Sequence, residues 1–144
     1  MMWKPDWKRR DRSHLYIVPP SKFKDQEFLT YQLIPSAKVI DWRQEVLATT
    51  RSSQKLLGIN VQTEITRLQN ICNSEQKVFS VINTEYLLAH FTERMREQFW
   101  LALWSDFPNF TGILVFTVLN SPAILPDEYS LENWRKEERL FSAE

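Results

Sequence analysis

Three nearly unbroken apolar runs are the clearest pattern along the chain. They cover residues 15–18, 78–82 and 113–119. Runs of this length, rich in β-branched and aromatic residues, are typical of strands covered on both faces of a parallel sheet. A weaker run at residues 37–40 brings the prediction to about four mostly parallel strands.

The segments between these runs carry apolar residues at helical spacing. The strongest pattern extends from Thr84 to about Asp106. Weaker helical patterns occupy residues 26–34, 42–49, 60–72 and 128–141. Strands that alternate with helices predict an α/β fold of three layers, with helices on both faces of the sheet and right-handed crossovers.

Composition places the chain among ordinary globular proteins. Its 144 residues suffice for one domain with a substantial core, and 43% of them are hydrophobic and 25% charged. No apolar run approaches the roughly 18 residues of a membrane span, and the polar, basic first residues do not form a secretory signal. We therefore expect a cytoplasmic protein that does not enter a membrane.

Neither a metal site nor thiol chemistry is expected. The single cysteine, Cys72, excludes an internal disulfide and a cysteine cluster, and its place on the apolar side of a predicted helix indicates a core residue. His14 and His90 are far apart, and Glu93 and Arg94 after His90 are not a metal-ligand set. The prediction is a chain without a metal or a cofactor.

The charge pattern divides the chain into three parts. We expect a basic aromatic arm at residues 1–13, an α/β domain at 14–125 and a C-terminal helix or tail at 126–144. Although the net charge is zero, residues 1–24 carry seven basic and two acidic groups, whereas residues 125–144 carry six acidic and three basic ones. Opposite charges at the two ends predict two different surfaces or head-to-tail association of copies.

The arm interleaves aromatic and basic side chains, which is typical of a segment that grips an anionic surface. The residues concerned are Trp3, Trp7, Lys8, Arg9, Arg10 and Arg12. They fit either an acidic protein partner or the backbone of a nucleic acid. Nucleic-acid binding would weaken steeply with salt and would be lost on deletion of residues 1–13.

Aromatic residues widen the apolar stripe of the longest predicted helix beyond one face. They are Trp100, Trp104 and Phe107, and Trp134 adds an indole in the C-terminal segment. Because one helix in a small domain rarely buries apolar residues all round, they predict a surface for a protein partner or for self-association. The alternative is that the C-terminal helix folds back over them.

The loop after the first strand contains no glycine. It comprises residues 19–26, and the only glycines in the chain are Gly58 and Gly112. A phosphate cradle needs backbone N–H groups turned inward, which glycine permits most readily. Ser21, Lys22 and Lys24 offer either a residual anion site or a solvated polar loop.

The order and spacing of the elements over residues 14–125 resemble a small P-loop NTPase domain of the AAA/STAND kind, similar to the small P-loop protein of BREX phage-exclusion systems. The resemblance implies a G-x-x-x-x-G-K-[ST] loop after the first strand, but Asp25 stands at the lysine position and Gln26 at the hydroxyl position. It also implies a magnesium-binding acid at the end of strand 78–82, where Ile82 or Asn83 stands. Glu85 is the acidic residue closest to that position, and Asn120 or Ser121 matches a sensor-like polar group at the tip of the last strand.

The resemblance therefore implies a degenerate nucleotide site and a pseudo-NTPase. The residues of that site are Ser21, Lys24, Asp25, Asn83 and Glu85. We expect a non-catalytic adaptor or assembly subunit of a bacterial multiprotein system associated with DNA, such as phage defence. The alternatives are a nucleic-acid-binding subunit that uses the arm, and a divergent NTPase in which Glu85 acts as a base rather than as a residue that stabilises a helix start.

Overall fold

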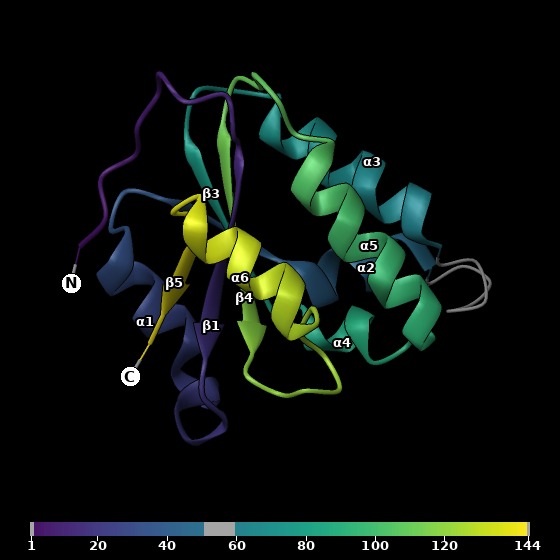
Figure 1. Cartoon of the computed structure of the whole chain (residues 1–144). Coiled ribbons are helices and arrows are strands. Elements are labelled where there is room, and N and C mark those ends of the chain that lie inside the picture. Colours follow the sequence, from purple (N-terminus) through teal and green to yellow (C-terminus); the bar gives the residue numbers. More distant parts are fainter. Residues whose placement is uncertain (1, 51–59, 144) are drawn as a thin grey trace.

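A five-stranded, wholly parallel sheet forms the centre of the protein (Figure 1). The computed structural model describes residues 2–50 and 60–143, so residues 51–59 of the predicted domain lie outside the described part. The strands follow the order β2-β3-β4-β1-β5 across the sheet. Their bounds are Ser13–Val18 for β1, Lys38–Asp41 for β2, Val78–Ile82 for β3, Ile113–Leu119 for β4 and Leu140–Ser142 for β5.

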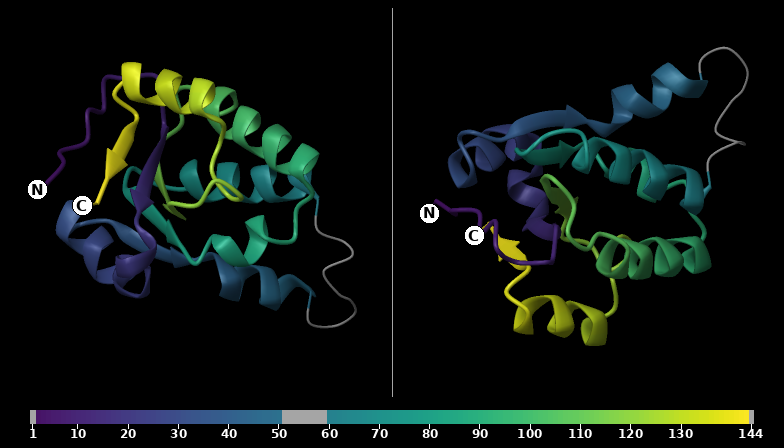
Figure 2. Two further views of the ribbon diagram at one scale, coloured as in Figure 1. Left: turned by 60° about the horizontal axis from the view of Figure 1, so that its bottom comes forward. Right: turned by 90° about the horizontal axis from the view of Figure 1, so that it is seen from above.

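Helices cover both faces of this sheet (Figure 2). They are a 3-10 helix η1 at Pro20–Asp25, and α1 Gln26–Leu33, α2 Trp42–Thr50, α3 Val61–Cys72, α4 Glu85–Leu88, α5 Glu93–Ser105 and α6 Glu128–Lys136. Alternate strand side chains enter two separate apolar clusters, as the period of a strand requires. Tyr16 and Val18 face α1, whereas Leu15 and Ile17 face the cluster that contains residues of α2, α3, α5 and α6. The predicted three-layer α/β fold is confirmed.

The longest predicted helix is two helices. The chain leaves helical geometry between α4 and α5, and Thr92 caps the new helix by accepting a hydrogen bond from the Met95 backbone N–H at 3.2 Å. A threonine cap of this kind satisfies one of the free N–H groups at a helix start. His90 therefore lies in the exposed link and not within a helix, and its Nδ1 is 2.6 Å from the carbonyl oxygen of Tyr86.

A fifth strand replaces the end of the predicted C-terminal helix. Helix α6 stops at Lys136, and Glu138 adopts a φ of 57°. This left-handed residue reverses the chain direction, after which β5 pairs in parallel with β1 from Leu15↔Leu140 to Ile17↔Ser142. The helical prediction for residues 137–141 was wrong because a short edge strand carries too few residues for its period to be read.

The N-terminal arm is packed against its own chain. The Trp3 backbone N–H donates to the carbonyl oxygen of Leu33 at 2.9 Å, and the Trp3 ring lies 5.0 Å from both His14 and Phe141. His14 is buried in this contact, and burial, together with the nearby Arg139 and Arg9 charges, lowers its pKa to about 3. The imidazole is therefore neutral at physiological pH and serves as a packing surface for the arm.

Arg139 joins three distant parts of the chain. Its guanidinium lies 4.1 Å from the ring centroid of Trp104 and 4.6 Å from that of Trp134. It donates to the Ser13 carbonyl and hydroxyl oxygens at 3.0 and 2.8 Å and to the Trp104 carbonyl at 2.9 Å. Burial lowers its pKa to about 10, so the side chain still carries its charge at neutral pH. The start of β1, the end of α5 and the link from α6 to β5 are thus fixed by one residue.

Candidate functional site

The carboxyl ends of β1, β4 and β3 form one edge at which a ligand site is expected in an α/β fold. β4 lies between β1 and β3, so the loop after β1 and the residues after β3 flank the end of β4. The helix after β1 packs on one face of the sheet and the helix after β4 on the other. Neighbouring strands whose connections diverge in this way are a topological switch point, where open α/β sheets bind ligands at the carboxyl edge.

Two amide side chains form hydrogen bonds with each other at this edge. The Nε2 group of Gln26 donates to the Oδ1 atom of Asn83 at 3.1 Å, and the Asn83 backbone N–H donates to the Gln26 Oε1 atom at 2.9 Å. Gln26 is buried, and Asn83 adopts a φ of 59°, a left-handed conformation that asparagine tolerates better than most residues. The pair links the loop after β1 directly to the loop after β3.

The remaining residues of the predicted nucleotide site do not converge on a common point. The loop after β1 is wound into η1, in which the Lys22 N–H donates to the Pro19 carbonyl at 3.0 Å. Ser21, Lys24 and Asp25 are exposed on it. A 3-10 turn directs its N–H groups along its own axis, so this loop does not form an inward-facing cradle.

Glu85 lies at this edge and has a raised pKa. It is half-buried at the start of α4, and burial raises its pKa, which its own backbone N–H and Arg43 partly oppose. Its Oε2 atom is buried and has no hydrogen-bond partner among the described residues. The part of the chain that the structure describes brings no group of three histidine, cysteine or acidic residues together as a metal site. A carboxyl group at this position stabilises the α4 N-terminus through the helix dipole.

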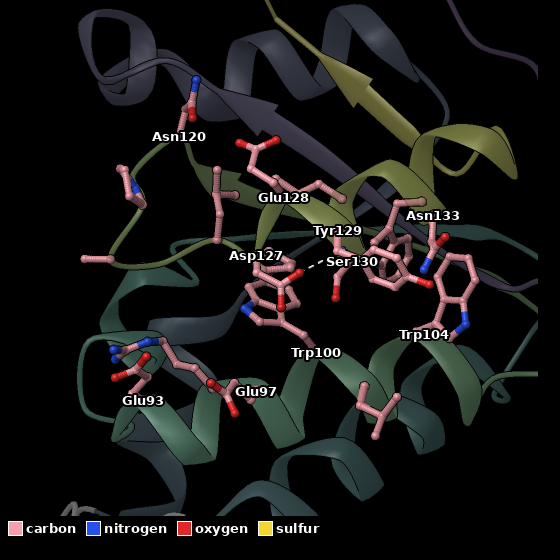
Figure 3. A pocket seen from close by; sticks show the side chains of 18 residues that line it. Glu93, Glu97, Trp100, Trp104, Asn120, Asp127, Glu128, Tyr129, Ser130 and Asn133 are labelled. Carbon is pink, nitrogen blue, oxygen red and sulfur yellow. Dashed lines mark hydrogen bonds between the residues drawn. The ribbon is translucent and has the colours of Figure 1, made fainter.

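A hollow on the described surface lies elsewhere, between α5 and α6. This groove has a volume of about 780 Å³ and extends from Asn120 at the end of β4 to Asn133 on α6 (Figure 3). The aromatic and aliphatic side chains on its walls are those of Trp100, Trp104, Leu125, Leu131 and Trp134. Two large apolar side chains at its sides, Leu101 and Tyr129, are 66% and 80% exposed.

The groove is acidic along one half. Glu93 and Glu97 lie on its α5 side, and Asp127 and Glu128 lie at the start of α6 (Figure 3). Asp127 caps α6 by accepting from the Ser130 N–H at 2.7 Å. Among the described residues, the one basic side chain on its lining is that of Arg96, which donates to the carbonyl oxygens of Leu88 and Phe91 at 3.2 and 2.7 Å.

The predicted aromatic surface is largely core, and this corrects the sequence-based assignment. Trp100, Phe107 and Trp134 are buried, and Trp104 is half-buried with its ring 4.9 Å from that of Trp134. The Trp100 indole N–H donates to the Ile124 carbonyl at 3.1 Å. The loop after β4 and the C-terminal helix fold back over these rings, which was the alternative. Leu101, next to Trp100 in the sequence, is the exposed apolar residue of this region, and the sequence pattern did not single it out.

The basic residues of the arm divide into two groups. Arg9 and Arg12 are half-buried: Arg9 contacts Asp11 at 2.9 Å and the Glu137 carbonyl at 2.6 Å, and Arg12 contacts the Phe110 carbonyl at 2.8 Å. Trp3 and Trp7 are also partly covered by the fold. Of the basic residues on the described arm, only Lys4, Lys8 and Arg10 are exposed. The arm therefore presents exposed cations to a ligand, but its aromatic side chains are packed against the fold and are not free to stack on one.

Cys72 is confirmed as a core residue. Its Sγ–H donates to the Gly112 carbonyl at 3.1 Å, and burial raises the pKa of the thiol to about 12. A thiol with this pKa holds almost no thiolate at neutral pH and is unreactive as a nucleophile.

Comparison with known proteins adds no relative to this picture. No protein-family model, curated protein or solved structure matches the chain. Among the described residues, no helix has the length and apolar character needed to cross a bilayer.

Proposed function

We propose that this protein is a non-catalytic adaptor that binds a partner protein in the groove between α5 and α6. The observation that carries the proposal is the Gln26–Asn83 pair, which occupies the carboxyl edge of the sheet, while the groove between α5 and α6 stays open. An α/β scaffold whose ligand edge is closed by its own side chains acts through other surfaces. The exposed Leu101 and Tyr129 side chains beside the groove are the apolar surface such a role requires.

The resemblance to P-loop domains supports a pseudo-NTPase origin for this scaffold. At the positions where that family binds triphosphate and magnesium, this chain has an exposed aspartate, Asp25, and a glutamine engaged with Asn83. A carboxylate facing a triphosphate repels it. Membership of a bacterial assembly associated with DNA, such as phage defence, is the biological setting that the resemblance implies.

Calorimetric titration with ATP and with GTP, each with Mg²⁺, tests the non-catalytic assignment. We expect no binding heat at millimolar nucleotide, since the site lacks both the phosphate-binding loop and the metal-binding acid. Lys24→Ala and Glu85→Gln are the variants for comparison. Micromolar affinity that either variant abolishes would contradict the adaptor proposal and establish a divergent NTPase.

Nucleic-acid binding by the arm is the second candidate, and the exposure of Lys4, Lys8 and Arg10 supports it. Three phosphate contacts correspond to a slope of about −3 in log affinity against log salt. Because Trp3 and Trp7 are packed on the fold, we expect only weak binding of DNA or RNA. This binding should be lost at physiological salt, and also in the triple variant in which Lys4, Lys8 and Arg10 are all replaced by glutamine. The matched control is a triple variant in which three other exposed basic residues, Arg43, Lys77 and Lys136, are replaced by glutamine. This second function is favoured if the wild type binds DNA or RNA tightly, the arm variant loses that binding and the control variant retains it.

A further inference from the structure

We infer that the partner segment held by the groove is a basic amphipathic helix, with lysine or arginine residues flanking apolar anchors. This inference rests on the proposed function and names the chemistry of its partner. Three features of the groove support it: the charges on its sides, its apolar walls and the exposed residues beside it.

The charges on the groove are not balanced within the described chain. Glu93 and Glu97 are one helical turn apart on α5, a spacing at which like charges repel and destabilise a helix. Among residues 2–50 and 60–143, neither of them nor Glu128 takes part in an ion pair. The Arg96 side chain donates to two backbone carbonyls and forms no ion pair with these glutamates. A basic ligand supplies the missing counter-charge.

The walls select apolar side chains between those charges. Leu125 and Leu131 line the hollow together with the three indoles, and its volume of about 780 Å³ is within the usual range for sites that enclose a ligand. Aromatic and aliphatic anchors that fill such desolvated pockets supply most of the affinity of an interface, and surrounding charges set its specificity.

The exposed residues indicate a polypeptide and not a small cation. Leu101 and Tyr129 belong to opposite helices and are mostly exposed beside the hollow. A small ligand inside the hollow would leave both side chains in water. A helix laid along the groove covers both with its apolar face, which is the helix-in-groove mode of peptide recognition.

Fluorescence anisotropy with two labelled synthetic peptides tests the inference. One is a Leu/Lys amphipathic helix and the other its Leu/Glu counterpart of equal length. The protein variants are Glu93→Lys with Glu97→Lys, which reverses the charge of the α5 side, and Leu101→Asp, which removes the apolar contact. Asp25→Lys with Glu27→Lys is the control, since it makes the same charge change at two exposed residues in and beside α1, away from the groove.

We expect the Leu/Lys peptide to bind and the Leu/Glu peptide not to bind. Both groove variants should lower the affinity for the Leu/Lys peptide by about tenfold or more. The control variant should bind this peptide with an affinity within about twofold of the wild type. Equal binding of the two peptides, or failure of the Leu/Lys peptide to bind at all, overturns the inference.

The two groove variants separate failure of the inference from failure of the function. If Leu101→Asp abolishes binding and the charge reversal leaves it unchanged, the groove is a docking site whose partner is not basic; the inference is then wrong and the proposed function stands. If the peptide binds and neither groove variant changes its affinity, the groove is not the docking site, and both proposals are overturned.

Discussion

Replacement of Trp100 by alanine lowers the free energy of unfolding by about 3–5 kcal/mol, the usual cost of removing a large aromatic side chain from a core. Only 4% of Trp100 is exposed, and its ring meets Phe116 edge-on at 5.8 Å between centroids. The substitution also leaves the Ile124 carbonyl without the indole N–H that donates to it. Urea denaturation followed by circular dichroism measures the loss.

The matched control for Trp100 is its neighbour in the sequence. Leu101 is 66% exposed, so Leu101→Ala should change the free energy of unfolding by no more than about 0.5 kcal/mol. The contrast separates a core residue from a surface residue at adjacent positions of α5. Comparable destabilisation by the two substitutions, or a stable Trp100→Ala protein, would show that α6 and the loop after β4 do not cover Trp100 as described.

Arg139→Ala has the second large expected effect, a loss of about 3 kcal/mol. It removes three hydrogen bonds to Ser13 and Trp104 and the cation between the Trp104 and Trp134 rings. The Ser13 and Trp104 carbonyls then lose a charged donor at a site that water reaches poorly. Arg139→Lys should recover only part of this loss, because an ammonium group lacks the planar fork that stacks and donates in several directions.

Arg135→Ala is the comparison for Arg139. The Arg135 side chain is 55% exposed and pairs with Glu132 at 2.6 Å on the surface of α6. Exposed pairs of this kind contribute about 0–1 kcal/mol. Urea denaturation gives the stability of each variant, and hydrogen exchange of the β5 amides shows whether the C-terminal strand opens. Equal stability of Arg139→Ala and Arg135→Ala would contradict the bridging role of Arg139.

The sheet could be predicted from the sequence because its central strands are buried on both faces. Residues 15–18, 78–82 and 113–119 are apolar without alternation, and all three became strands of the parallel sheet. The break between α4 and α5 was missed even though Thr92 is a good helix cap, since the apolar spacing continues across it. β5 was missed because only three residues form it.

The arrangement of the candidate site depends on contacts that no local pattern encodes. Gln26 and Asn83 are 57 positions apart, and Arg139 reaches Ser13 across 126 positions. The sequence showed that glycine was missing from the loop after β1, but not that a glutamine would link that loop to β3. It showed an excess of aromatic residues around Trp100, but not which of them the C-terminal helix would cover.

Amide chemical shifts of the isotope-labelled protein, followed in separate titrations with Mg·ATP and with the Leu/Lys peptide, test the central claim most directly. If the carboxyl edge is closed and the groove is the binding surface, the peptide moves signals of α5, α6 and residues 120–127, and Mg·ATP moves none. The contrary result is a saturable Mg·ATP shift at residues 20–26 and 83–85, with no response of α5 and α6 to the peptide.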